Sequence, residues 1–291
     1  MSERTAEPAW TDRQWASADG LTLHYRDYAG REDRPPLLCI PGLTRNARDF
    51  EPVAEAFAGE WRVIAVDLRG RGQSDDAKDA ASYNPAQYVA DIEALLEQAG
   101  IARFVAVGTS LGGIVTMLLA ARDPARIAGA VINDIGPVVE DKGLDRIREY
   151  LGQARTFPSW MHAARSLRDT HGAAHPGYEI GDWLVAAKRM MSVGGNGRIA
   201  FDYDMKIAEP FNAPPPATPA DLWPAWRALG GRPVLVLRGA LSDLLSRKTF
   251  ARMAKELPDA DLVTVARTGH APSLGEPEAR EAIARLLAKC A

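Results

Sequence analysis

The stretch FVAVGTSLGG, residues 104–113, runs from four apolar residues into two small residues, a serine, a leucine and two glycines. This order is typical of a buried strand that ends in a sharp turn. Gly108 and Gly112 let the backbone bend tightly, which leaves the Ser110 hydroxyl exposed at the tip of the turn. The Gly-x-Ser-x-Gly pattern arises by chance in about one chain in ten of this length. The surrounding sequence therefore has to decide what it means.

Strand and helix patterns alternate along most of the chain. Apolar runs predict strands at residues 22–28, 37–40, 62–66, 104–108, 130–133, 234–237 and 262–265. Helical spacing predicts helices at 46–57, 85–98 and 111–122, and helix patterns follow the last two strands. This alternation predicts an α/β fold with a mostly parallel sheet covered on both faces, in which the N-terminal edge is open to antiparallel pairing.

A long insertion interrupts this alternation at residues 136–216. It holds three helix-like pieces, at 144–154, 159–170 and 182–191, then a GGNGR stretch and a proline-rich return, NAPPPATP. We expect a helical cap without strands of its own that roofs a pocket. The core domain then comprises residues 1–135 and 217–291.

Composition narrows the class of protein. The 291 residues carry a formal net charge of −3, which gives no reason to expect nucleic acid or a membrane as partner. The two cysteines, Cys39 and Cys290, favour a reducing compartment over a disulfide framework. The first residues lack the apolar segment of a secretory signal, so we expect a cytoplasmic protein that binds a small molecule. No zinc-binding H-E-x-x-H pair and no phosphate-binding loop occurs, so we expect neither metal nor cofactor.

A serine nucleophile needs a base to take its proton and an acid to orient that base. Among five histidines, His270 alone follows the last predicted strand in a loop, at the sheet edge where Ser110 is expected. Asp243 and Asp134 each follow a predicted strand and lie between Ser110 and His270 in the chain. We expect Asp243 to be the acid, with Asp134 as the alternative, because Asp134 also fits a turn residue that caps the entry to the insertion.

When a serine attacks a carbonyl, an oxyanion develops that needs two hydrogen-bond donors. Backbone N–H groups at strand ends supply these donors without rearrangement. Leu111, directly after Ser110, is one candidate. Leu43 is the second, because Pro41-Gly42 lets the backbone of its loop approach closely. The alternative is that Pro41-Gly42 is a turn with no role in chemistry.

These motifs, with the Asp67-Leu-Arg-Gly-Arg-Gly-Gln-Ser74 turn, resemble the α/β-hydrolase family over nearly all of the chain from about residue 36. The resemblance is to the capped branch that holds esterases, lactonases and carbon–carbon hydrolases. It implies Ser110 as nucleophile, His270 as base and Asp243 as its orienting acid, with Leu43 and Leu111 as oxyanion donors.

Two features bear on the reaction within that family. Many members have His-Gly where this chain has Pro41-Gly42, which affects loop geometry and substrate choice. Haloalkane dehalogenases and epoxide hydrolases of the family place an aspartate at the elbow, whereas Ser110 favours acyl chemistry.

The sequence therefore predicts a serine hydrolase that cleaves a carboxylic ester or lactone of a small organic substrate through an acyl-enzyme. A carbon–carbon hydrolase of a diketone and a non-catalytic small-molecule-binding protein are the alternatives. Candidate substrate-binding residues are Arg45, which suits a substrate carboxylate, and Trp160, Trp183 and Met190, which suit a pocket wall. The alternatives for these residues are an exposed loop arginine and ordinary core packing.

Overall fold

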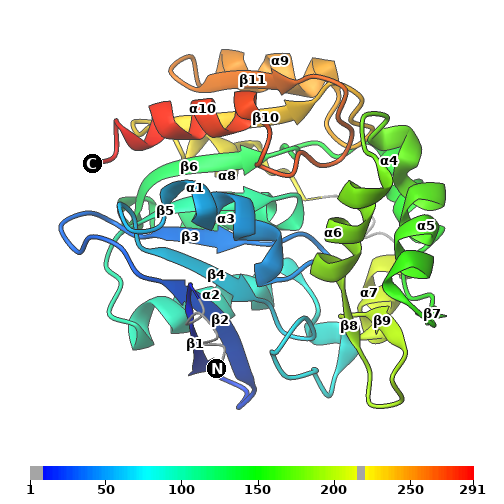
Figure 1. Cartoon of the computed structure of the whole chain (residues 1–291). Coiled ribbons are helices and arrows are strands. Elements are labelled where there is room, and N and C mark those ends of the chain that lie inside the picture. The colour runs from blue at the N-terminus through cyan, green and yellow to red at the C-terminus, as the bar shows by residue number, and fades with distance from the viewer. Residues whose placement is uncertain (1–8, 215–219) are drawn as a thin grey trace, which may run out of the picture.

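The computed structural model describes residues 9–214 and 220–291, and a large mixed sheet runs through its centre (Figure 1). Within the described residues this sheet has eight strands in the order β1-β2-β4-β3-β5-β6-β10-β11. Their bounds are Thr11–Ala16 (β1), Thr22–Tyr28 (β2), Leu37–Ile40 (β3), Val63–Asp67 (β4), Phe104–Thr109 (β5), Ile127–Asn133 (β6), Val234–Gly239 (β10) and Asp261–Val265 (β11).

The strands from β4 to β11 pair in parallel, whereas β1 and β2 form an antiparallel edge. Continuous apolar runs form the buried parallel strands, since helices cover both faces there. Sequence reasoning missed β1 because only Trp15 of its six residues is buried, so the strand shows no apolar alternation. The predicted α/β-hydrolase architecture is confirmed.

Helices cover the sheet on both faces. Buried residues of α2 (Pro85–Gln98), α3 (Leu111–Arg122) and α8 (Trp223–Arg227) pack in one cluster with the sheet, and those of α1 (Glu51–Phe57) and α10 (Pro277–Leu287) pack in another. The helix α9 (Arg247–Glu256) lies beside the edge strand β11. A Cβ atom on Gly112 would lie 1.9 Å from the Ile40 carbonyl oxygen, so only glycine lets α3 approach β3 this closely.

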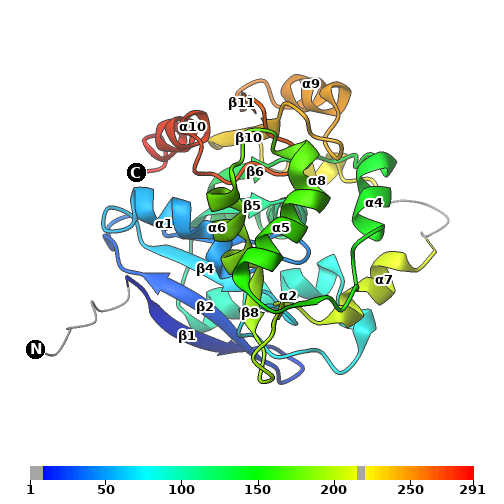
Figure 2. The same cartoon turned by 45° about the vertical axis from the view of Figure 1, so that its right-hand side comes forward.

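A separate group of elements lies between β6 and β10 in the chain and forms the cap. The helices α4, α5 and α6 sit over the carboxyl ends of the parallel strands (Figures 1 and 2). The bounds of the cap elements are Asp141–Arg148 (α4), Thr156–Phe157 (β7), Trp160–His171 (α5), Ile180–Met190 (α6), Met191–Val193 (β8), Ile199–Phe201 (β9) and Ala208–Asn212 (α7).

The expectation of a cap without strands is wrong, because β7, β9 and β8 form a small antiparallel sheet. The GGNGR stretch is the turn that joins β8 to β9. Gly194 N–H donates to the Arg198 carbonyl across the turn at 2.8 Å, and Gly197 has a φ of +74° that favours glycine. Strands of two or three residues are too short to show an alternating pattern. The expected return to the core at residue 217 falls outside the described residues.

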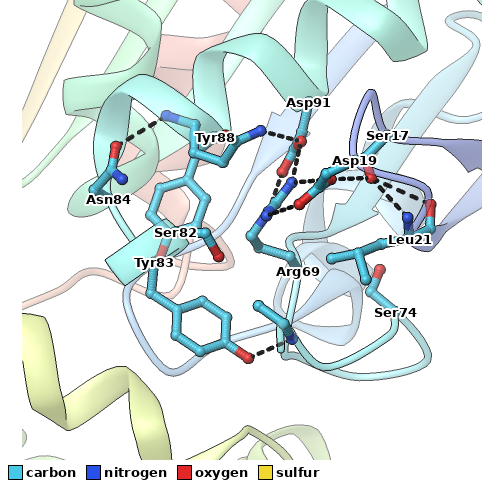
Figure 3. Close-up of polar contacts among 12 residues, drawn as sticks. Ser17, Asp19, Leu21, Arg69, Ser74, Ser82, Tyr83, Asn84, Tyr88 and Asp91 are labelled. Carbon is cyan, nitrogen blue, oxygen red and sulfur yellow. Dashed lines mark hydrogen bonds and ion pairs between the residues drawn. The ribbon is translucent and has the colours of Figure 1, made fainter. Parts of the chain in front are cut away.

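The loop after β4 is anchored by a buried arginine (Figure 3). The Arg69 guanidinium donates two hydrogen bonds to Asp91 of α2, both at 2.7 Å, and two to Asp19 of the β1–β2 turn, both at 2.9 Å. Asp91 and Asp19 thus share one fully buried cation, which fixes the loop between the sheet edge and α2.

No helix within residues 9–214 or 220–291 combines the length and the apolar character needed to cross a lipid bilayer.

Candidate active site

Ser110 stands at the junction of β5 and α3, in a backbone conformation that few residues adopt. Its φ of 52° and ψ of −116° turn the chain sharply, and its N–H donates to the Asn133 carbonyl of β6 at 2.9 Å. A Cβ atom on Gly108 would lie 2.4 Å from the Gly112 carbonyl oxygen, so the turn requires glycine there. The predicted elbow is therefore present.

His270 comes from the loop after β11 and contacts Ser110 directly. Its Nε2 lies 2.9 Å from Ser110 Oγ, and its Nδ1 lies 2.8 Å from Asp134 Oδ2. Asn133 at the end of β6 donates through Nδ2 to the Pro272 carbonyl at 2.9 Å, which ties the His270 loop to the sheet. The three side chains form one continuous chain of hydrogen bonds from carboxylate to hydroxyl.

Asp134, rather than Asp243, is the carboxylate that meets His270. It follows β6 directly, is fully buried, and has a φ of 55° that turns its side chain back toward the sheet edge. Its Oδ1 accepts from Gly239 N–H at 2.8 Å, and its Oδ2 also accepts from the Ser242 hydroxyl at 2.7 Å. These donors stabilise the carboxylate in one orientation.

The expected contact between Asp243 and His270 is thus corrected by the structure. Asp243 lies four residues beyond the end of β10 and turns toward the cap, where its Oδ2 and Oδ1 accept from Nε and Nη2 of Arg146 on α4 at 2.5 and 2.9 Å. Burial opposes ionisation of Asp243, but the hydrogen bond and charge of Arg146 outweigh it and lower the pKa of this carboxyl. Asp134 has the shorter path because β6 is the immediate neighbour of β5, which carries Ser110.

The loop that carries Leu43 lies against the serine. A Cβ atom built on Gly42 would lie 3.6 Å from Ser110 Cβ. Leu111 is the first residue of α3, so its N–H has no carbonyl partner within the helix. Both candidate oxyanion donors are therefore close to Ser110 in the chain or across the loop, and their role stays a prediction.

Arg71 holds the Leu43 loop in place, and sequence reasoning missed it. Its buried guanidinium donates to the Leu43 carbonyl from Nε at 2.9 Å and from Nη2 at 2.8 Å. Nη2 also donates to the Tyr88 hydroxyl at 3.0 Å. An arginine between two glycines reads as an exposed turn, so no local signal indicated this role.

A cavity of about 600 Å³ opens beside Ser110 and His270, between the core and the cap. Three of the four candidate substrate-binding residues line it, namely Arg45, Trp183 and Met190. Trp160 does not line it and packs instead against the cap's own cluster of buried residues. Helical spacing alone does not reveal which face of a cap helix meets the core. The lining side chains that the sequence did not indicate include Arg146, Tyr150, His171, His175 and Tyr178.

Two of these missed residues are neutral histidines. Burial, reinforced by the positive charges of Arg146 and Arg45, lowers the pKa of His171 to about 4. Burial and the charge of Arg45 lower the pKa of His175 to about 4 as well. The His175 ring packs against Tyr178 and Trp183, with centroid distances of 4.8 and 6.1 Å. This wall offers neutral hydrogen-bonding groups at neutral pH.

Comparison with known proteins agrees with this geometry. A family model described as "Alpha/beta hydrolase family" matches residues 37–286. The chain belongs to the alpha/beta hydrolase family. Its fold matches the crystal structure of an alpha/beta hydrolase from Novosphingobium aromaticivorans with a TM-score of 0.94 and 59% sequence identity, over 98% of this chain and 100% of that one.

Two further relatives of this alpha/beta hydrolase are named for an activity. A 3-hydroxybutyrate-oligomer hydrolase from Cupriavidus necator is 35% identical over 282 residues, which cover 94% of this chain and 95% of that protein. The crystal structure of an E-2-(acetamidomethylene)succinate hydrolase is 25% identical, with a TM-score of 0.80 over 96% of this chain and 99% of that one.

Proposed function

We propose that this alpha/beta hydrolase cleaves carboxylic esters of small organic acids through a covalent acyl-enzyme. The continuous hydrogen bonds from Asp134 through His270 to Ser110 carry this proposal. His270 Nδ1 lies 2.8 Å from Asp134 Oδ2, and its Nε2 lies 2.9 Å from Ser110 Oγ. A hydroxyl becomes a competent nucleophile in this setting because the imidazole accepts its proton as the bond to the carbonyl carbon forms.

The reaction proceeds in two stages. Ser110 Oγ attacks the ester carbonyl, His270 Nε2 takes the hydroxyl proton, and Asp134 stabilises the imidazolium. The N–H groups of Leu43 and Leu111 stabilise the oxyanion, and the imidazolium then protonates the leaving alcohol. Water, activated by His270, attacks the acyl-enzyme in the second stage and releases the acid.

The substrate we propose is a short ester of 3-hydroxy acids. The relative from Cupriavidus necator supports this choice, since it is named a 3-hydroxybutyrate-oligomer hydrolase and covers nearly the whole chain. The cavity volume of about 600 Å³ falls in the range of small-molecule sites. Lactones and diketones would require the same three side chains, so the test includes them.

The test is a panel of 3-hydroxybutyrate dimer, p-nitrophenyl acetate, a γ-lactone and a vinylogous diketone, assayed with the wild type and with Ser110→Ala. We expect the wild type to hydrolyse the dimer, and Ser110→Ala to lower kcat by roughly 10⁴-fold or more. Turnover confined to the diketone would replace the ester proposal with carbon–carbon hydrolysis. A rate unaffected by Ser110→Ala would exclude serine catalysis.

A further inference from the structure

Arg45 and Arg146 are among the residues that line the cavity. Arg45 follows the loop of Gly42 in the core, and Arg146 comes from α4 of the cap. Both positive charges contribute toward lower pKa values of His171, His175 and Tyr150. The five side chains therefore form one cluster, which we call the arginine cluster, in which two guanidinium groups lie near two histidines and Tyr150.

The arginine cluster lies next to the reacting serine. An ideal Cβ atom on Gly42 would stand 3.5 Å from Arg45 Cγ and 3.6 Å from Ser110 Cβ, so the two side chains flank the same glycine. His270 is also among the charges that act on His175. The Arg45 side chain thus begins beside the serine that would attack the carbonyl.

Two polar atoms of the cluster are buried without a partner. Arg45 Nε and His175 Nδ1 make no hydrogen bond to any residue in the described ranges 9–214 and 220–291. A buried donor without an acceptor is unfavourable, most of all on a charged group. Both residues line the cavity, but these two atoms are themselves shielded from solvent, so a ligand pairs with them only after the surrounding side chains shift.

The protein's own carboxylates orient both arginines without using all of their donors. Asp49 accepts from Arg45 Nη2 at 2.5 Å, which leaves Nε unpaired. Asp243 accepts from Nε and Nη2 of Arg146, so the Nη1 group of Arg146 takes no part in this bidentate pair. Asp243 thereby acts as a positioning residue for Arg146. Rigid planar donors of this kind suit a carboxylate better than a flexible lysine does.

Acidic residues also border the cavity. Asp49 pairs with Arg45, whereas Glu276 and Asp182 act elsewhere. Glu276 Oε1 accepts from Ser273 N–H at 2.8 Å, and Asp182 is exposed at the start of α6. The carboxylates of Glu276 and Asp182 are not among the groups whose charge shifts the pKa of the two histidines of the arginine cluster, whereas Arg45 and Arg146 are. The charges of both arginines disfavour protonation of these two histidines, and Asp134 opposes them at His175.

We propose that Arg45 and Arg146 form a carboxylate subsite, and that the natural substrate is an ester that carries a free carboxylate. This inference rests on the proposed ester hydrolysis. A dimer of a 3-hydroxy acid has such a group, because its alcohol half ends in a carboxylate. The neutral imidazoles of His171 and His175 hydrogen-bond to the substrate without adding a charge that competes for the arginines.

The kinetic test compares 3-hydroxybutyrate dimer with its methyl ester, which lacks the charge. We expect Arg45→Gln and Arg146→Gln each to raise KM for the dimer by roughly 10- to 100-fold, the loss of a charge-assisted hydrogen bond, and to change KM for the methyl ester by less than about threefold. Arg165→Gln, which removes an exposed charge from α5, is the control and leaves both values unchanged. Equal effects on the two substrates would overturn the subsite.

A binding measurement separates this inference from the proposed function. Ser110→Ala is titrated calorimetrically with 3-hydroxybutyrate and with methyl 3-hydroxybutyrate, alone and combined with Arg45→Gln. We expect the acid to bind more tightly than its ester, and Arg45→Gln to remove the difference. Failure of ester hydrolysis with this preference intact would overturn only the activity. Absence of the preference would overturn the subsite even if esters are cleaved.

Discussion

Two histidine–aspartate pairs in the described part of the chain differ in their third partner. His270 contacts Asp134 at 2.8 Å and the Ser110 hydroxyl at 2.9 Å. His24 of β2 contacts Asp67 at 2.7 Å, but its other ring nitrogen meets a second carboxylate, Asp12, at 2.9 Å. The Ser110 hydroxyl, next to the first pair, can give its proton to His270. The Asp12 carboxylate, next to the second pair, instead stabilises a proton on His24.

The difference explains why one pair suits chemistry and the other suits structure. Burial opposes the charge on His24, but hydrogen bonds to Asp67 and then Asp12 outweigh it and raise the pKa of this imidazole. A histidine kept protonated by two carboxylates is a poor base. Asp67 also accepts from Ala47 N–H at 2.7 Å and Gln73 N–H at 3.0 Å, so the His24 pair joins the loops after β3 and β4.

The largest expected effect comes from the carboxylate of the first pair. Asp134→Asn should lower kcat by roughly 10³- to 10⁴-fold, because the amide no longer stabilises the imidazolium or fixes the reactive tautomer. Steady-state kinetics on 3-hydroxybutyrate dimer measures this effect, with circular dichroism to verify folding. His24→Gln is the matched control and should leave kcat within about threefold. A small effect of Asp134→Asn on kcat would contradict the catalytic role assigned to the His270 pair.

The second pair should respond in stability instead. His24→Gln should reduce the free energy of unfolding by about 3 kcal/mol, since it leaves Asp67 and Asp12 without their shared cation. The folded-state pKa of His24 is raised, so its contribution is complete below about pH 6.5 and is lost as pH rises through the folded-state pKa. Urea unfolding at pH 6 and pH 9 should show the larger difference between variant and wild type at pH 6. A larger difference at pH 9 would reverse the assigned sign.

At Asp243 we expect a much smaller effect on turnover than at Asp134, and this difference tests which of the two is the acid. Asp243→Asn should keep kcat on a neutral ester within about tenfold, because its carboxylate meets Arg146 and not His270. The measurement pairs it with Asp134→Asn on the same ester. A loss at Asp243→Asn as large as that at Asp134→Asn would mean that Asp243 reaches His270 during the reaction.

The core of the fold follows from patterns that are local in the sequence. The helices α2 and α3 and the strands β2 and β3 begin and end where their periodicity and caps predict. Ser110 and His270 follow from the same reasoning, because a residue at the end of a parallel strand has only one sheet edge to occupy.

The misjudged and missed parts depend on contacts between distant segments. Asp134 and Asp243 both follow strands, and only the positive φ of Asp134 and the position of Arg146 separate them. Arg71 and Arg146 have ordinary surroundings in the sequence, and their partners lie 28 and 97 residues away. The short strands of the cap are held by pairing with one another, which no single segment reveals.

The backbone at Ser110 has an evolutionary consequence. Its combination of φ 52° and ψ −116° is one that glycine tolerates better than any residue with a side chain. A glycine at this position would relieve conformational tension and remove the hydroxyl in the same step. The strain at this position can therefore be relieved only by a change that also removes the nucleophile, so strain and hydroxyl are retained together.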